Sequence, residues 1–191
     1  MDFPGSRSTY VTLTAACALA TSVACRGSGH ARVLSFRRPP MPAGFREQSG
    51  PGWRIAVPST WTSEPQPLPD GVWLAVDAQI VDDYHSNVSV VRESFAGESY
   101  DYAKAAELSI HREARATVES ARDDVVDGDP TFVVEARWAP IPPANVVYRS
   151  MQTDLASRGA GYVVTCSAAA TAFERYRSTC EAILRSFAVE R

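Results

Sequence analysis

The clearest pattern along the chain is an alternation of apolar and polar side chains that returns in several short segments. In residues 72–80 this alternation is the most regular, with Val72, Leu74 and Val76 on one side. A period of two places every second side chain on the same face of an extended strand. The segments that share the pattern, and are therefore predicted to be strands, are 53–57, 72–80, 87–94, 131–139, 145–153 and 161–168.

Two other segments repeat their apolar residues every three or four positions, which is the spacing of an amphipathic helix. The first predicted helix runs from Ser99 to about residue 122, with a stripe formed by Ala103, Ala106, Ile110, Ala114, Val118 and Ala121. The second closes the chain, with a seam formed by Phe173, Tyr176, Cys180, Ile183, Leu184 and Phe187. Turns are predicted at 82–86, 123–129 and 140–143. This order predicts an α+β domain, an antiparallel sheet flanked by helices.

The amino terminus carries an apolar run at residues 10–24, preceded by Arg7 and followed by Cys25. The run is shorter than the roughly 20 residues that a helix needs to cross a bilayer, so it predicts an export signal. Residues 22–25 resemble a bacterial lipobox, in which the cysteine receives a lipid. Cys25 is therefore the predicted lipid anchor. Ser22 and Ala24 also fit ordinary signal cleavage, which leaves a secreted, unlipidated protein as the alternative.

Composition then divides the chain into three parts. Residues 1–25 are the predicted signal peptide, 26–50 a flexible tether rich in proline and arginine, and 51–191 one globular domain. The tether is basic, which suits contact with anionic head groups, although a disordered linker explains the same composition. From Pro51 onward acidic residues outnumber basic ones. This balance argues against nucleic acid as a partner.

The four cysteines fit an exported protein. Cys17 leaves with the signal, Cys25 takes the lipid, and Cys166 and Cys180 remain as a pair. In an oxidising compartment this pair is predicted to form a disulfide that links the last strand to the last helix, closing a loop of about 15 residues. The alternative is a pair of buried thiols.

Two regions of the sequence resemble a known superfamily. They are residues 52–58 (GWRIAVP) with Trp61, and residues 161–166 (GYVVTC) ahead of a helix that ends in ILRSF at 183–187. Together with the central helix they resemble the PsbP-like and DcrB-like superfamily over about residues 44–189. The resemblance implies an α/β/α sandwich used for binding, found in bacterial envelope lipoproteins, photosystem accessory proteins, a Ran-binding transport factor and chaperones, without enzymatic activity.

Candidate chemistry is sparse. The acidic segment 123–129 lacks the spacing of a helix-loop-helix calcium site, and Asp127-Gly128 is better explained as a turn. The group Asp82, Asp83 and His85 has no second histidine or cysteine at the spacing of a zinc site. No serine lies in a nucleophile motif. The sequence therefore predicts no catalytic residue, no metal and no cofactor.

One surface of the predicted sheet is a candidate for partner binding. On the strands, a set of mixed apolar and charged residues lies opposite the first apolar face, and we take it as the candidate partner-binding face: Trp73, Val133, Arg137, Val147, Arg149 and Met151. If a helix covers these residues, they form a second core layer with a polar margin. If none does, they form a cradle for a peptide or helix.

The sequence thus predicts a lipid-anchored binding or scaffold module of the cell envelope, facing the periplasm or the exterior, that contacts another envelope protein and has no catalytic activity. Two alternatives stay open. One is a small-ligand or metal-binding carrier, or an enzyme, with a pocket between the sheet and the long helix. The other is a periplasmic chaperone or secretion accessory.

Overall fold

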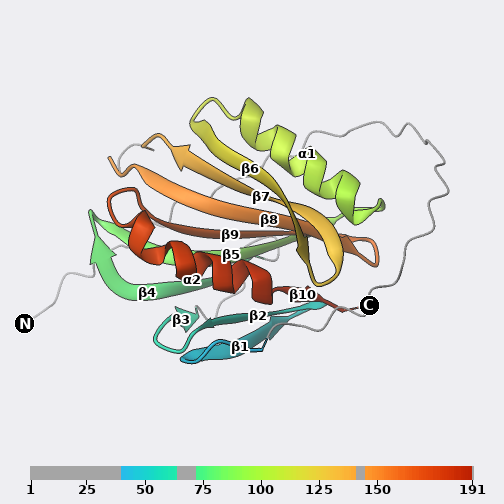
Figure 1. Ribbon diagram of the computed structural model, residues 1–191, viewed down its shortest axis with the longest axis horizontal. Coiled ribbons are helices and arrows are strands. Elements are labelled where there is room, and N and C mark those ends of the chain that lie inside the picture. Colours follow the sequence, from blue (N-terminus) through green and yellow to red (C-terminus); the bar gives the residue numbers. More distant parts are fainter. Residues whose placement is uncertain (1–39, 64–71, 141–144, 191) are drawn as a thin grey trace, which may run out of the picture. The chain divides into compact units, whose positions relative to one another are not determined.

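The computed structural model describes residues 40–63, 72–140 and 145–190. In this part of the chain seven strands form one antiparallel sheet in the order β3-β4-β5-β9-β8-β7-β6 (Figure 1). Their bounds are β3 Thr62–Ser63, β4 Val72–Val81, β5 Tyr84–Ser94, β6 Ala116–Val126, β7 Asp129–Trp138, β8 Tyr148–Ser157 and β9 Ala160–Ala169. The predicted α+β class with an antiparallel sheet is confirmed.

A second, smaller sheet has the order β1-β2-β10, with β1 Phe45–Gly50, β2 Trp53–Pro58 and β10 Ala188–Val189. The helix α2 (Phe173–Ser186) contacts both β2 of the small sheet and β9 of the large one. Figure 1 shows α2 lying between the two sheets. The helix thereby joins them into one core.

The main core lies on the α2 side of the large sheet. Paired residues of neighbouring strands share a face, so the register Val88, Cys166, Met151 follows one row across β5, β9 and β8. All three side chains are fully buried. The apolar side chains of α2 and β2 pack against this row, among them Ile55, Val57, Phe173, Ile183, Leu184 and Phe187.

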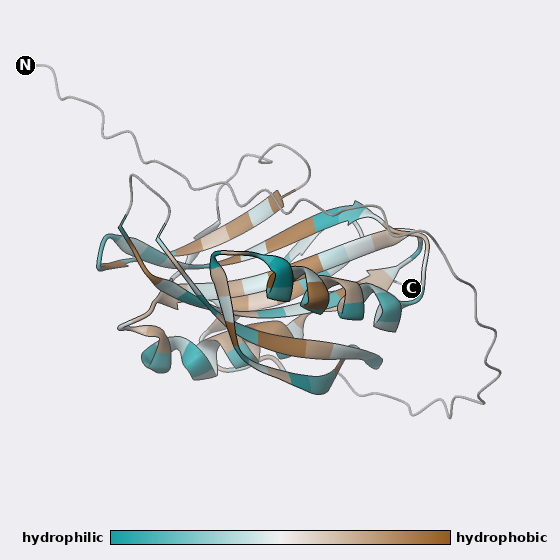
Figure 2. Cartoon of the chain, turned by 90° about the horizontal axis from the view of Figure 1, so that it is seen from above, coloured by the Kyte–Doolittle hydropathy of each residue, from teal (hydrophilic) through white to brown (hydrophobic). Residues whose placement is uncertain are grey.

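The helix α1 (Ser99–Arg112) packs on the opposite face, over β6, β7 and β8. Its Ile110 contacts a smaller apolar cluster formed by Val134, Ala136, Trp138 and Tyr148. The large sheet therefore carries one helix on each side. Figure 2 shows hydrophobic residues concentrated in the strands, whereas both helices carry hydrophilic residues along part of their surface.

The predicted central helix was wrong beyond residue 112. The helix ends at Arg112, where Glu113 adopts an extended conformation, and Ala116–Val126 is the edge strand β6. A β-bulge between Val118 and Ser120 shifts the strand's alternation by one residue. Because of this shift, Val118 and Ala121 lie three positions apart, the spacing of a helix. The bulge therefore gave this strand the same spacing of apolar residues as the helix before it.

Two predicted turns were too long. Of the acidic segment 123–129, only Asp127 and Gly128 form the turn between β6 and β7, both with positive φ, as a tight hairpin requires. The reading of Asp127-Gly128 as a turn is therefore confirmed, whereas Asp123 and Asp124 belong to a strand. Likewise, only Asp82 and Asp83 connect β4 to β5, and Tyr84 begins the strand.

The folded domain starts before the predicted boundary at residue 50. Strand β1 lies inside the predicted tether but pairs with β2 along its whole length, from Phe45 opposite Pro58 to Gly50 opposite Trp53. These hydrogen bonds make it part of the small sheet. The predicted signal peptide, Cys25 and the tether up to residue 39 lie outside the described residues, as does most of the predicted turn 140–143.

Candidate binding surface

The six residues of the predicted partner-binding face do not form one exposed surface. Val133 and Met151 are 3% and 0% exposed in the core beneath α2. Trp73 is half-buried on the same side, and its ring lies 5.2 Å from that of Trp53. For these three residues the core-layer alternative holds, because α2 and the small sheet cover them. Their assignment to a binding face is corrected.

The other three predicted residues lie near one end of the sheet. Arg137 is exposed on β7, Val147 is half-buried just before β8, and Arg149 is half-buried on β8. Arg137 and Arg149 are register partners on the α2 side. A binding role for Arg137, Val147 and Arg149 stays a prediction.

Arg149 belongs to a cluster of charges at the beginning of α2. The buried carboxylate of Glu135 accepts hydrogen bonds from Arg149 and from Arg177, the latter at 2.6 Å from Nη1. Both guanidinium groups lie over the ring of Phe173, at 4.7 and 5.3 Å from its centre. Glu174 of the helix also pairs with Arg149, at 2.7 Å.

These partners set the electrostatics of the cluster. The hydrogen bonds from Arg177 lower the pKa of Glu135 against the opposing effect of burial, and the charge of Arg149 adds to the lowering. Glu135 is thus a carboxylate held by two arginines. The arrangement fixes the start of α2 on the sheet. Each charged group pairs with an opposite charge, although the buried Nε of Arg149 has no hydrogen-bond partner among the described residues. Paired charges of this kind are typical of a structural clamp rather than of a reactive group.

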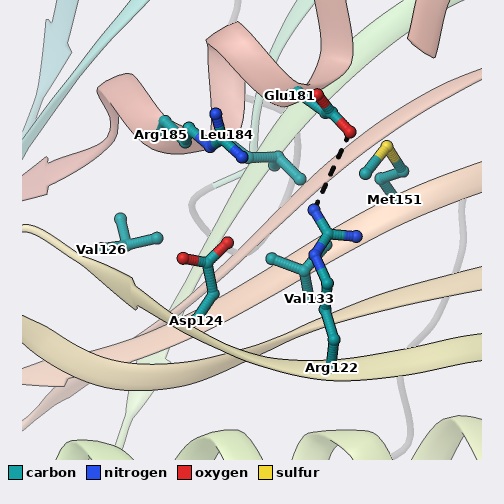
Figure 3. A pocket seen from close by; sticks show the side chains of 8 residues that line it. All are labelled: Arg122, Asp124, Val126, Val133, Met151, Glu181, Leu184 and Arg185. Carbon is teal, nitrogen blue, oxygen red and sulfur yellow. Dashed lines mark ion pairs between the residues drawn. The ribbon is translucent and has the colours of Figure 1, made fainter. Parts of the chain in front are cut away.

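A shallow groove lies between α2 and the neighbouring strand β6 (Figure 3). Arg122 of β6 and Glu181 of α2 approach each other across it, with an N–O distance of 3.9 Å. Its lining consists of Arg122, Asp124, Val126, Val133, Met151, Glu181, Leu184 and Arg185. The groove has no room for a water molecule. In this conformation it is a seam between helix and strand, closed by an ion pair.

A larger cavity of about 450 Å³ lies where the described chain begins, between the small sheet and the end of α2. It is lined by Pro40, Met41, Pro42, Glu47, Ala56, Ala182, Arg185 and Ser186. Glu47 and Arg185 give it one charge of each sign. This mixed lining favours no single class of ligand.

The α1 side of the sheet has an unexpected polarity. The register places Leu74, Ser89, Thr165, Gln152 and Val134 in one row across β4, β5, β9, β8 and β7. The row is apolar at both ends and polar in the middle. The next row repeats the pattern with Val76, Asn87, Ser167, Ser150 and Ala136. A covered sheet face is normally apolar, so this polar centre distinguishes the α1 side from the α2 side.

Hydrogen bonds link the groups of the polar centre into two chains. In the first, the hydroxyl groups of Tyr84 and Ser167 lie 2.7 Å apart, and Ser167 donates to Asn87 at 3.1 Å. In the second, Thr165 donates to Gln152 at 3.2 Å, and the amide of Gln152 donates to the Asp154 carboxyl at 3.0 Å. These bonds offset the cost of burying polar groups.

Beside the first chain, three aromatic rings are stacked. The ring of Tyr148 lies 5.3 Å from that of Tyr84 and 5.8 Å from that of Trp138, with interplanar angles of 9° and 6°. Among the residues that the structure describes, the buried Tyr148 hydroxyl has no hydrogen-bond partner. Burial raises its pKa above the usual tyrosine value. Tyr148 is therefore held as a neutral phenol.

Beyond α1, the α1 side of β4, β5 and β9 forms the surface that we call the open sheet face. It is defined by the half-buried residues Leu74, Val76, Ser89, Val91, Val163 and Thr165. Contacts of α1 concentrate on β6, β7 and β8 instead. The sequence carried a signal for this face, because Ser89 and Thr165 alternate with the buried Val88, Val90, Val164 and Cys166. That alternation identifies two faces but not the one that a helix covers.

Among residues 40–63, 72–140 and 145–190, no group of three or more histidine, cysteine, aspartate or glutamate side chains is arranged to hold a metal ion. Within the same residues, no helix is both long and apolar enough to span a membrane. Cys166 and Cys180 are joined by a disulfide with a Cα–Cα distance of 5.5 Å, as predicted. Their sulfur atoms are buried between β9 and α2, where they hold the helix on the sheet.

No protein-family model matches the chain, and no curated protein matches it in sequence. Solved structures, in contrast, share its fold. The cyanobacterial PsbP protein (CyanoP) of Synechocystis sp. PCC 6803 is 18% identical, with a TM-score of 0.56 over 87% of this chain and 97% of that one. LpqN of Mycobacterium tuberculosis, described as involved in cell envelope biogenesis, is 13% identical, with a TM-score of 0.58 over 77% and 92%.

A third similar structure is the Ran-binding protein Mog1p of Saccharomyces cerevisiae, which is 12% identical, with a TM-score of 0.51 over 76% of this chain and 95% of that one. The chain therefore has the PsbP-like and DcrB-like fold, and the resemblance seen in the sequence is confirmed at the level of the fold. At these identities the likeness concerns the architecture alone, because one fold can carry unrelated functions.

Proposed function

We propose that the protein is an exported, lipid-anchored binding module of the cell envelope, which contacts another envelope protein through the open sheet face and catalyses no reaction. The observation that carries the proposal is the composition of this face. Apolar side chains such as Leu74 and Val91 lie half-exposed there beside hydrogen-bonding groups such as Ser89 and Thr165. A mixed surface of this kind suits a protein partner.

Three further observations support an envelope location. The apolar run at 10–24 is followed by the lipobox-like sequence that ends in Cys25. A disulfide between Cys166 and Cys180 is typical of proteins that fold in an oxidising compartment. The same fold occurs in LpqN, which is described as a protein of cell envelope biogenesis.

The lipid anchor is tested by metabolic labelling with a fatty-acid analogue. The wild-type protein is expected to take up the label and to fractionate with membranes. The variant Cys25→Ala is expected to lose both properties, because no other residue of the lipobox-like sequence carries a thiol. Label that persists in Cys25→Ala, or a wild-type protein that takes up none, contradicts the anchor but leaves the binding role open.

The binding surface is tested by in-cell crosslinking followed by purification from envelope extracts. Leu74→Asp places a charge in the open sheet face, whereas Ile80→Asp makes the same change on the same strand at a residue that is 59% exposed. We expect Leu74→Asp to lose a crosslinked protein that the wild type and Ile80→Asp both retain, with circular dichroism confirming that both variants fold. If Leu74→Asp retains every wild-type partner, the open sheet face is not the contact surface.

The polar centre on the α1 side favours a second candidate, a carrier of a small hydrogen-bonding ligand bound on the sheet beside α1. The groups that such a ligand would meet first are Asn87, Ser89 and Thr165, all half-buried. A thermal-shift screen of the purified protein against metabolites and metal ions separates the two candidates. A carrier gains several degrees of melting temperature from one ligand class, and this gain disappears in Thr165→Val.

A further inference from the structure

Asp154 is the most deeply buried acidic side chain on the α1 side of the sheet. It lies on β8 with 0% of its surface exposed, opposite Val163 of β9. Its carboxyl oxygens accept hydrogen bonds at 3.0 and 3.2 Å, both from the side-chain amide of Gln152. Within the described part of the chain, no hydrogen bond or ion pair joins this carboxyl to a lysine, arginine or histidine.

A buried carboxyl without a cation is held in its neutral form. Burial disfavours the charged state and raises the pKa of Asp154 to about 8, against the smaller lowering by the Gln152 hydrogen bond. The charge of Glu93 on β5 raises it further. The hydrogen-bonded chain that reaches this carboxyl is neutral: Gln152 of the same strand donates to it, and Thr165 of β9 donates to Gln152. Nothing on these strands compensates a negative charge.

The amino-terminal half of α1 docks on the row of the sheet that neighbours Asp154. The Ser99 hydroxyl accepts a hydrogen bond of 3.0 Å from the backbone N–H of Ala156, two residues from Asp154. Tyr102 is 3% exposed and donates a hydrogen bond of 2.7 Å to Glu93. Its ring lies on Gly161, where an added Cβ would come within 2.4 Å of it. Gly161 pairs with both Ala156 and Glu93, so these three residues form one row across β8, β9 and β5. This row is the neighbour of the row that contains Asp154, and the α1 contacts lie on it.

The docked helix buries few of its own side chains. Only Tyr102, Ala103 and Ile110 of the helix are buried, and the residue before the helix, Glu98, makes no side-chain capping bond. A helix with a small buried stripe and no side-chain N-cap bond is an element of low local stability. The equilibrium between docked and undocked α1 is therefore sensitive to a new charge on the sheet beneath the helix.

We propose that Asp154 is a proton-controlled latch for α1: the helix is docked while this carboxyl carries its proton, and loss of the proton favours an undocked state in which water reaches the carboxylate. Undocking uncovers the part of the sheet beneath α1 and enlarges the open sheet face. The proposal concerns the domain itself and does not depend on the proposed envelope function.

Hydrogen exchange of the α1 amides tests the latch, measured from about pH 5 to about pH 9 and corrected for the intrinsic pH dependence of exchange. In the wild type, protection of α1 is expected to fall by up to about tenfold per pH unit and to level off once the carboxyl is ionised in the docked state. Asparagine has the shape of the neutral acid but cannot ionise. In Asp154→Asn, protection of α1 is therefore expected to be independent of pH. Strand β2, on the far side of the sheet, serves as the internal reference.

Equal pH dependence of α1 protection in the wild type and in Asp154→Asn overturns the proposal. If Asp154→Asn does not fold, the wild type alone decides by an NMR titration of the Asp154 side-chain carboxyl carbon. A midpoint well above that of an ordinary aspartate, accompanied by the loss of α1 protection, supports the latch. A midpoint near that of an ordinary aspartate overturns it.

Discussion

The two sides of the large sheet bury their acidic residues in opposite ways. On the α2 side, Glu135 accepts hydrogen bonds from Arg149 and Arg177, and its pKa is lowered. On the α1 side, the Asp154 carboxyl accepts hydrogen bonds from the Gln152 amide and, among the described residues, from no cation, and its pKa is raised to about 8. One acid is therefore buried as a charge and the other as a neutral group. The α2 side thus holds a paired carboxylate, whereas the α1 side holds a protonated acid that ionises only at higher pH.

Apolar side chains are also more deeply buried on the α2 side than on the open sheet face. A substitution in the α2-side core is therefore expected to have the largest effect on stability. Phe187 is 1% exposed and contacts Trp53 and Tyr162 in the α2-side core. Phe187→Ala is expected to lower the free energy of unfolding by about 3–5 kcal/mol, measured by urea denaturation, because it leaves a cavity. Leu74→Ala on the open sheet face serves as the control. A loss for Leu74→Ala as large as that for Phe187→Ala contradicts the difference between the two sides.

The disulfide is expected to have the next largest effect. Reduction, or replacement of both Cys166 and Cys180 by alanine, is expected to cost about 3 kcal/mol, because the bond closes a loop of about 15 residues in the unfolded chain. Thermal unfolding with and without reductant measures the loss. Hydrogen exchange is expected to rise in α2 and to remain unchanged in α1. Loosening of α1 instead would show that the disulfide supports the other side of the sheet.

Glu135→Gln tests the charge cluster. It leaves Arg149 and Arg177 without their buried carboxylate, and since both arginines are partly exposed to solvent, the expected cost at neutral pH is about 2 kcal/mol. The measurement is urea denaturation as a function of pH. Because the folded-state pKa of Glu135 lies below its unfolded value, its contribution is present above the unfolded pKa and is lost as the pH falls through the folded pKa.

The difference between the wild type and Glu135→Gln is therefore expected to shrink in acid. Asp154 has the opposite sign, since its raised pKa makes the folded state lose stability as the pH rises from about 4 towards about 8. A cost of Glu135→Gln that grows in acid would contradict the assignment of Glu135 as the ionised member of this pair of acids.

The smallest expected effect concerns the polar centre. Thr165→Val removes the hydroxyl that donates to Gln152 and is expected to cost about 1 kcal/mol in thermal unfolding, because a partly buried hydrogen bond is lost. Ser89 lies opposite Thr165 in the same row. Ser89→Ala is expected to change the free energy of unfolding by no more than about 0.5 kcal/mol. Equal costs for the two variants would show that the Thr165–Gln152 hydrogen bond contributes nothing.

Much of the fold was predictable because local patterns report local structure. Strands β2, β4, β7 and β9 and the helix α2 follow from alternation and helical spacing. The Cys166–Cys180 disulfide follows from the placement of both residues on apolar stripes. Strand β6 was missed because its bulge at Val118 produced helical spacing. A bulge is set by pairing with β7, which a single segment of sequence does not reveal.

The candidate surface was predicted less well. Alternation showed that Trp73 and Leu74 point to opposite sides of β4, but the apolar character of both sides concealed which one α2 covers. The polar centre of Ser89, Thr165 and Gln152 emerged only when the register brought residues from three strands into one row. Such rows join residues far apart in the chain, and their polarity is a property of the assembled sheet.

By itself, the sequence determined the class of fold, most of the strands and the pairing of Cys166 with Cys180, since hydrophobic periodicity and cysteine placement act along the chain. Only the tertiary structure decided which face of the sheet is apolar and buried and which has a polar centre, because strand register sets the neighbours of each side chain. The same register brings two arginines to Glu135 and, within the part of the chain that the structure describes, none to Asp154. Two acids on neighbouring strands thereby acquire opposite charge states.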